Sequence, residues 1–136
     1  MTVAIPKPMP IADGASAPFF QGLALRNLLL QYCGDCGCWQ LGEHRCNRCR
    51  GALTWLPATG RAHLHAFTVI HLPYHPAFAP LLPYNACTVE LEEGPRIFSN
   101  VAGCTKERLR TGMPLTLDFA ANGDDWLPVF RPTAID

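Results

Sequence analysis

Apolar and polar side chains alternate along the second half of the chain, in short runs separated by turn signals. Alternation with a period of two is typical of β-strands that bury one face. The pattern predicts five strands, at residues 60–71, 84–92, 96–101, 115–120 and 126–131. In the first strand we expect one face to carry Ala62, Leu64, Ala66, Thr68 and Ile70, and the other His63, His65, Phe67, Val69 and His71. Five strands, the first of them long, with a short helix before the fourth, predict an OB-fold barrel; a small open sandwich also fits the pattern.

The first third of the chain lacks this alternation and has a different composition. Residues 1–16 contain three prolines, followed by Asp13, Gly14 and Ser16, and predict a flexible arm. Phe19, Phe20 and Leu23 then recur at helical spacing and predict a short amphipathic helix. The segment 33–51 holds five of the seven cysteines and few apolar side chains. It therefore needs a disulfide or a bound metal in place of a hydrophobic core. We therefore expect three parts: an arm at 1–16, a helix with a cysteine-rich ribbon at 17–51, and a β-domain at 52–136.

Two C-x2-C pairs stand close together, Cys33 with Cys36 and Cys46 with Cys49. The spacing lets one tight turn direct both of its sulfurs to one ion, so the two pairs predict a site of four thiolates. Four thiolates suit zinc or iron, and we expect zinc because structural zinc ribbons are the commoner use. Cys38 could replace one of these ligands, as could His44, although both residues fall outside the symmetric spacing. We expect a closed site that folds the segment and has no catalytic role.

Charge and cysteine content exclude several classes of protein. Lys+Arg and Asp+Glu both number 11 in 136 residues, so the net charge is zero and no nucleic-acid partner is expected. No apolar stretch reaches the roughly 20 residues that a membrane helix requires. The first ten residues lack the apolar segment of a signal peptide. Seven cysteines in a chain with no route of export predict a reducing compartment, the cytoplasm.

A proline-rich loop at residues 71–83 is longer than a connection requires, which suggests a function. Its aromatic residues could form an apolar docking surface, stack on bases as in other OB-folds, or plug one end of the barrel, as we also consider for Leu81. The candidate docking residues in this loop and in the helix are Phe19, Phe20, Leu23, Tyr74, His75 and Phe78.

Two further groups of side chains could carry chemistry. Cys87 and Cys104 could act as nucleophiles with a nearby histidine as base, but neither lies in a nucleophile signature. Cys87 falls on an apolar strand face, where cysteine is usually a small core residue. His63 and His65 lie two apart on a strand and could share a metal, but no third ligand accompanies them.

A series of short motifs extends over most of the chain. In order they are Phe19–Leu23, Leu28–Cys33, the two cysteine pairs, Leu53–Trp55, Thr59–Arg61, Phe67–His71, Pro76–Phe78, Leu82–Tyr84, Val89–Arg96, Gly112–Pro114 and Leu127–Phe130. The series resembles the zinc-ribbon plus OB-fold proteins of acyl-CoA metabolism, long catalogued as a domain of unknown function. The chain departs from that family at Asn47, where proline is common, and at Arg50, where a small residue is common.

The resemblance implies a mainly β fold, with an N-terminal helix and a rubredoxin-like zinc ribbon followed by a five-stranded OB-fold barrel. It implies that Cys33, Cys36, Cys46 and Cys49 are the zinc ligands. It also implies a non-catalytic subunit that accompanies acyl-CoA thiolases, hydroxymethylglutaryl-CoA synthases, aldolases, hydratases or acetyltransferases, bridges their subunits and helps to shape the path of the acyl-CoA.

Our hypothesis from the sequence is an accessory subunit that binds structural zinc and docks on a thiolase-like enzyme, with a coenzyme A thioester as a candidate ligand of the complex. Two alternatives belong to other classes. One is a nucleic-acid-binding OB module with a zinc ribbon. The other is a free-standing enzyme that acts on coenzyme A thioesters through Cys104 or Cys38.

Overall fold

The computed structural model describes residues 17–72, 76–122 and 125–133. It contains one α-helix, two short 3-10 helices and eight strands in these residues. The bounds are α1 Ala17–Ala24, β1 Leu29–Cys33, β2 Trp39–Gln40, β3 Leu53–Pro57, β4 Arg61–Ile70, η2 Pro76–Leu81, β5 Tyr84–Leu91, β6 Arg96–Ser99, η3 Lys106–Arg108, β7 Pro114–Asn122 and β8 Asp125–Pro132. No helix in the described ranges is long and apolar enough to cross a membrane.

Five strands form a curled antiparallel sheet in the order β6-β5-β4-β7-β8. The two edges of this sheet meet at a parallel bridge between Val101 and Phe130. Around the bridge, the N–H of Ala102 donates to the carbonyl of Phe130 at 2.7 Å, and the N–H of Phe130 donates to the carbonyl of Asn100 at 3.1 Å. This is the closure of an OB-fold barrel, and the predicted fold class is confirmed.

The long first strand of the barrel, β4, pairs with β5 along most of its length and with β7 at its start. A β-bulge at His65 interrupts the pairing with β5, so Leu64 is opposite Val89 but Ala66 is opposite Thr88. The extra residue moves the following side chains to the other face. The uninterrupted alternation that we predicted for this strand is therefore wrong beyond Leu64, and Phe67 shares a face with the buried Cys87.

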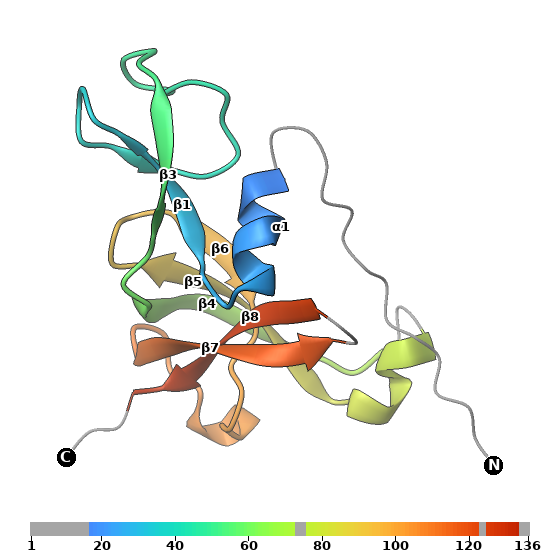
Figure 1. Ribbon diagram of the computed structural model, residues 1–136. Coiled ribbons are helices and arrows are strands. Elements are labelled where there is room, and N and C mark those ends of the chain that lie inside the picture. Colours follow the sequence, from blue (N-terminus) through green and yellow to red (C-terminus); the bar gives the residue numbers. More distant parts are fainter. Residues whose placement is uncertain (1–16, 73–75, 123–124, 134–136) are drawn as a thin grey trace.

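A second, three-stranded sheet in the order β2-β1-β3 forms the ribbon. Figure 1 shows β1 and β3 running from the tip of the ribbon down to the barrel. β3 lies C-terminal to the boundary expected at residue 51, yet it pairs with β1 along its whole length. Leu28 and Leu30, at the start of β1, are 2% and 0% exposed and belong to the same core as the barrel. The two parts of the chain therefore share β1.

The helix α1 confirms the helix expected near Phe19–Leu23 and packs against β8 and β1 (Figure 1). Leu23 is 4% exposed and joins the core. Gly22 allows the close approach to β1, because a Cβ there would lie 2.7 Å from Cγ of Leu29. The helix thus packs against both the ribbon strand β1 and the barrel strand β8.

The helix ends with an arginine where glycine is usual. The N–H of Arg26 donates to the carbonyl of Leu23 at 2.9 Å, and the N–H of Asn27 donates to that of Gly22 at 2.8 Å. This is a Schellman motif, which requires a left-handed residue, and Arg26 takes that role with φ of 58°. Its guanidinium lies 5.1 Å from the ring centroid of Trp126. The cation–π contact offsets part of the cost of the left-handed backbone.

Candidate functional site

Two turns of the ribbon, one around each cysteine pair, have the same backbone geometry. In the first, the N–H of Gly37 donates to the carbonyl of Cys33 at 2.8 Å; in the second, the N–H of Arg50 donates to that of Cys46 at 2.9 Å. Gly37 and Arg50 both have left-handed backbones, with φ of 75° and 67°. Gly37 takes this conformation without steric cost, because it has no Cβ. The second turn reaches the same conformation with an arginine.

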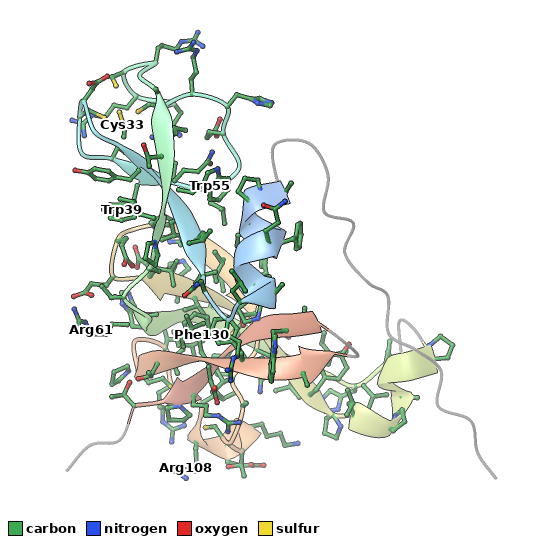
Figure 2. All side chains as sticks on the ribbon, viewed as in Figure 1. Cys33, Trp39, Trp55, Arg61, Arg108 and Phe130 are labelled. Carbon is green, nitrogen blue, oxygen red and sulfur yellow. The ribbon has the colours of Figure 1, made fainter. Side chains whose placement is uncertain are left out.

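The four cysteines expected to act together are brought together at the tip of the ribbon (Figure 2). Their sulfurs all lie within 4.8 Å of one another, with 3.4 Å between Sγ of Cys33 and Cys49 and 3.5 Å between Sγ of Cys36 and Cys46. A tetrahedral zinc site with Zn–S bonds of about 2.3 Å places its sulfurs about 3.8 Å apart. The donor set and its spacing therefore fit a metal ion. Neither Cys38 nor His44 belongs to the group of described residues that could hold it.

The hydrogen bonds of the cluster give its cysteines different pKa values. Burial acts to raise the pKa of Cys46, but hydrogen bonds from the N–H groups of Cys49 and Arg48 and from the amide of Gln40 lower that pKa to about 6. Burial and the hydrogen bond with Cys46 raise the pKa of Cys36 to about 12. These hydrogen bonds favour the thiolate at Cys46 and the thiol at Cys36, and a bound cation would displace the protons that the sulfurs still hold.

Two buried glutamines brace the cluster, and the sequence reasoning missed both. Gln40 donates to Sγ of Cys46 at 3.0 Å and accepts from the N–H of Asn47 at 2.9 Å. Gln31 donates to the carbonyl of Glu43 at 2.6 Å and accepts from its N–H at 2.9 Å. Gln31 and Gln40 are also direct partners in the β1–β2 pair. The available signal was an amide side chain on each short strand that flanks the first cysteine pair.

The backbone of Gly51 lies close to two of the sulfurs and leaves no room for a side chain. A Cβ at this position would lie 3.2 Å from Sγ of both Cys33 and Cys49, and 2.6 Å from Oδ2 of Asp35. Its N–H also donates to Cys49. A side chain at residue 51 would thus push against the cluster, whereas Gly34, in the first turn, has no heavy atom within 4 Å of such a Cβ.

The candidate docking residues have different fates in the structure. Leu23 is buried in the chain's own core, so its side chain is not presented to a partner. Phe19 and Phe20 are half-buried, contact each other edge to face at 5.2 Å, and pack against that core. Tyr74 and His75 lie outside the described residues, as does the side chain of Phe78.

Other exposed apolar side chains mark surfaces that the sequence did not single out. Leu72 and Leu81, at the two ends of the 71–83 loop, are 65% and 48% exposed, so Leu81 does not plug the barrel as we had considered. Phe98 on β6 is 88% exposed and borders a groove of about 360 Å³ over β4, β5 and β6. Small side chains, including Ala66 and Ala86, line this groove. Strand β6 has only four residues, too few for its pattern to identify the outward-facing phenylalanine.

Comparison with known proteins places the geometry in a family. A family profile, ChsH2, C-terminal OB-fold domain, matches residues 55–120. The solved structure of the Ltp2-ChsH2(DUF35) aldolase contains a chain that is 31% identical, with a TM-score of 0.83 over 91% of this chain and 98% of that one. The chain belongs to the DUF35 family. A DUF35 protein of unknown function from Sulfolobus solfataricus shares the fold at 14% identity, with a TM-score of 0.61 over 88% of this chain and 85% of that one.

Two curated relatives of this DUF35 chain are larger proteins. A probable enoyl-CoA hydratase alpha subunit of Thermomonospora curvata is 33% identical over 129 residues, which cover 93% of this chain and 40% of that protein. A DUF35 domain-containing scaffold protein of Methanothermobacter thermautotrophicus is 33% identical over 76 residues, which cover 54% of this chain and 56% of that protein. The DUF35 chain thus spans about half of the length of these relatives or less.

Proposed function

We propose that this DUF35 chain is an accessory subunit that binds structural zinc and docks on a thiolase-fold enzyme of acyl-CoA metabolism. The observation that carries the proposal is the likeness to the DUF35 chain of an aldolase complex, which extends over 98% of that chain. The names of the curated relatives, a scaffold protein and a subunit of an enoyl-CoA hydratase, support a role within larger assemblies. The partner would supply the catalytic residues, and this chain a rigid platform.

Two of the three thiols outside the cluster, those of Cys87 and Cys104, support a non-catalytic role. Burial raises the pKa of Cys87 to about 11, so this thiol stays protonated at neutral pH and is packed in the barrel core. The thiol of Cys104 donates to the carbonyl of Thr105 and has no hydrogen bond to a histidine within the described part of the chain. A nucleophilic cysteine needs a base or another group that stabilises its thiolate. Neither thiol has that arrangement.

Zinc is the metal we propose for the four sulfurs, with Cys33, Cys36, Cys46 and Cys49 as ligands. Cys33 and Cys46 are buried, and four protein donors complete a tetrahedron without an open position. A closed site of this kind adds folding energy and supplies no activated water. The ion would hold the two turns of the ribbon together and so fix the shape of the ribbon.

Docking would use the exposed apolar side chains of the barrel and of the 71–83 loop. The side chain of Phe98 is almost fully exposed to solvent, and the exposed side chains of Leu72 and Leu81 flank the loop. Large apolar side chains that are this exposed are candidates for a surface that a partner covers. We include Phe19 and Phe20 of α1, Tyr74, His75 and Phe78 as further docking candidates.

The proposal is tested by affinity capture of the tagged chain from its own host, followed by identification and quantification of the bound proteins. We expect a thiolase-fold enzyme in a fixed ratio, and we expect Phe98→Ser to reduce its recovery at least tenfold. Leu56→Ser is the matched control, since Leu56 is a partly exposed leucine on the ribbon strand β3. Recovery of RNA or DNA in place of an enzyme, or a chain that elutes alone, would contradict the proposal.

A further inference from the structure

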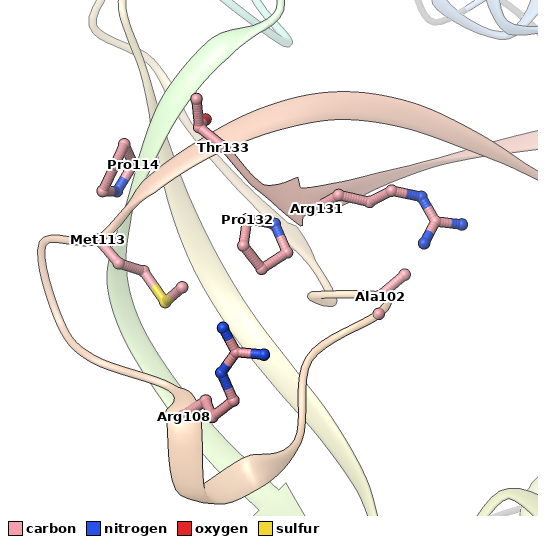
Figure 3. Close-up of a pocket in the computed structure, with 8 residues that line it drawn as sticks. Ala102, Arg108, Met113, Pro114, Arg131, Pro132 and Thr133 are labelled. Carbon is pink, nitrogen blue, oxygen red and sulfur yellow. The ribbon is translucent and has the colours of Figure 1, made fainter. Parts of the chain in front are cut away.

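A second concave site lies at the end of the barrel remote from the cysteine cluster; in Figure 2, Cys33 and Arg108 mark these opposite ends. The site is a pocket of about 480 Å³ between the η3 turn and the end of β8. Figure 3 shows the side chain of Arg108 rising from η3 toward Pro132, with Met113 on one side and Ala102 on the other. Its walls are mainly apolar, and a guanidinium group is the polar group at its centre.

The surroundings of this pocket are rich in positive charge, although the whole chain is neutral. Three of the 11 Lys and Arg residues fall within the five residues 106–110, which hold one acidic residue. The guanidinium of Arg110 is occupied, because its Nη1 donates to the carbonyls of Glu107 at 2.7 Å and Leu109 at 2.9 Å. The guanidinium of Arg108, in contrast, makes no hydrogen bond or ion pair with another residue that the structure describes. Its charge is available to a ligand.

Arg131, on β8, also lines the pocket, and Figure 3 shows its side chain extending past Ala102, away from Arg108. Its Nε donates to Oδ2 of Asp118 at 2.5 Å, and this bond, with the N–H of Phe119, lowers the pKa of that carboxyl. The bond uses one of the five N–H donors of Arg131. Gly103 leaves space for the group, since a Cβ there would lie 2.9 Å from Nη1 of Arg131. The guanidinium of Arg131 is thus held in place by Asp118, and that of Arg108 is the unpaired one in the pocket.

We propose that this pocket binds a phosphate group, with Arg108 as its principal ligand. Guanidinium groups match the geometry of phosphate oxygens through paired hydrogen bonds. The apolar walls at Met113 and Pro132 would contact the part of the ligand that carries the phosphate. The inference is independent of the docking proposal, because the pocket is formed within this chain. The phosphate could be free, as in pyrophosphate, or an ester of a nucleotide.

The test is isothermal titration calorimetry of the purified, zinc-loaded chain at low salt with three probes: pyrophosphate, adenosine 3′,5′-bisphosphate and adenosine. We expect both phosphorylated probes to bind and adenosine to show no binding at about 1 mM. Arg108→Gln should weaken binding at least tenfold, because charged hydrogen bonds to phosphate are lost. Tighter binding of the bisphosphate than of pyrophosphate would identify a nucleotide ester as the source, and equal or tighter binding of pyrophosphate a free phosphate.

Matched variants keep the test specific. Arg48→Gln removes an exposed arginine from the ribbon and should change the affinity less than twofold. The thermal midpoint of Arg108→Gln should equal that of the wild type, since this side chain makes no hydrogen bond or ion pair with a described residue. The proposal is overturned by an absence of phosphate binding, by an affinity unchanged in Arg108→Gln, by an equal loss in Arg48→Gln, or by binding of adenosine as strong as that of the bisphosphate.

Discussion

The ribbon and the barrel are stabilised in different ways, although β1 runs through both. The barrel surrounds fully buried apolar side chains, among them Leu64 and Phe130, each 0% exposed. At the tip of the ribbon, the groups that converge are sulfurs and the amides of Gln31 and Gln40. An apolar core forms without a cofactor, whereas a four-sulfur cluster holds a fold only when a cation binds it. The comparison teaches that the barrel can fold on its own apolar core, whereas the fold of the ribbon tip depends on a bound cation.

The largest effect that separates the two regions is expected from Cys36→Ser. The variant removes one of the four proposed zinc ligands, and structural zinc contributes about 10–16 kcal/mol to the folding of small zinc domains. We expect the ribbon to unfold and zinc to be lost, with the strands β4 to β8 retained. Zinc analysis and amide NMR spectra report the two outcomes. Cys38→Ser is the matched control, because its thiol lies outside the cluster, and it should retain a full equivalent of zinc.

Phe130→Ala perturbs the other region, because Phe130 is fully buried in the core of the barrel. Removing a fully buried phenylalanine side chain costs about 3–5 kcal/mol through lost contacts and a cavity. We expect a lower urea midpoint for the barrel, with zinc stoichiometry unchanged in the folded protein. Phe130→Leu should show the same pattern with a smaller loss. Zinc loss from folded Phe130→Leu would show that the two regions depend on each other.

An intermediate effect is expected at Gly51, where the metal cluster meets the backbone. In Gly51→Ala the added methyl group would press on Sγ of Cys33 and Cys49. We expect the zinc affinity, measured by competition with a chelator, to fall about tenfold or more, as for other changes beside metal ligands. Gly34→Ala, where a Cβ meets nothing within 4 Å, should leave the affinity unchanged. Equal affinities in both variants would argue against the cluster geometry.

A smaller effect, in the stabilising direction, is expected from Arg50→Gly. A left-handed backbone costs a non-glycine residue about 1 kcal/mol, and the equivalent position of the first turn is already Gly37. We expect the zinc-loaded ribbon to gain about 0.5–1 kcal/mol, and Gly37→Ala to lose a similar amount. Thermal unfolding of the two variants in excess zinc measures the difference. A loss of stability in Arg50→Gly would contradict this account of the second turn.

The smallest effect concerns the surface ion pairs of the barrel. Hydrogen bonds from Arg131 and from the N–H of Phe119 lower the pKa of Asp118 below its usual 3.8. The stabilisation is therefore complete above about pH 4–5 and is lost as the pH falls through the lowered pKa. Because the pair is half-exposed, the contribution is small. We expect Asp118→Asn to reduce the acid sensitivity of the thermal midpoint slightly below pH 4; an unchanged profile would show that the pair contributes nothing.

The five strands of the barrel and the cysteine cluster could be predicted because each has a local signature, whereas the three ribbon strands were not predicted. Alternation marks the strands, and two C-x2-C pairs mark the cluster. The bulge at His65 could not be predicted, since one extra residue reverses the faces of β4 without changing its composition. The roles of Gln31 and Gln40 depend on contacts across the ribbon, and the exposure of Phe98 depends on which face of β6 the barrel covers. These features follow from tertiary packing rather than from local pattern.

The most direct test of the central claim is amide hydrogen exchange of the whole chain, measured by mass spectrometry before and after the metal is removed with a chelator. We predict that protection is lost at residues 33–51 and retained in β4, β5, β7 and β8, whose hydrogen bonds surround the apolar core. Restoring zinc should restore the protection of the ribbon. Loss of protection in both regions together, or in neither, would contradict a barrel that stands on its own core and a ribbon that depends on its metal.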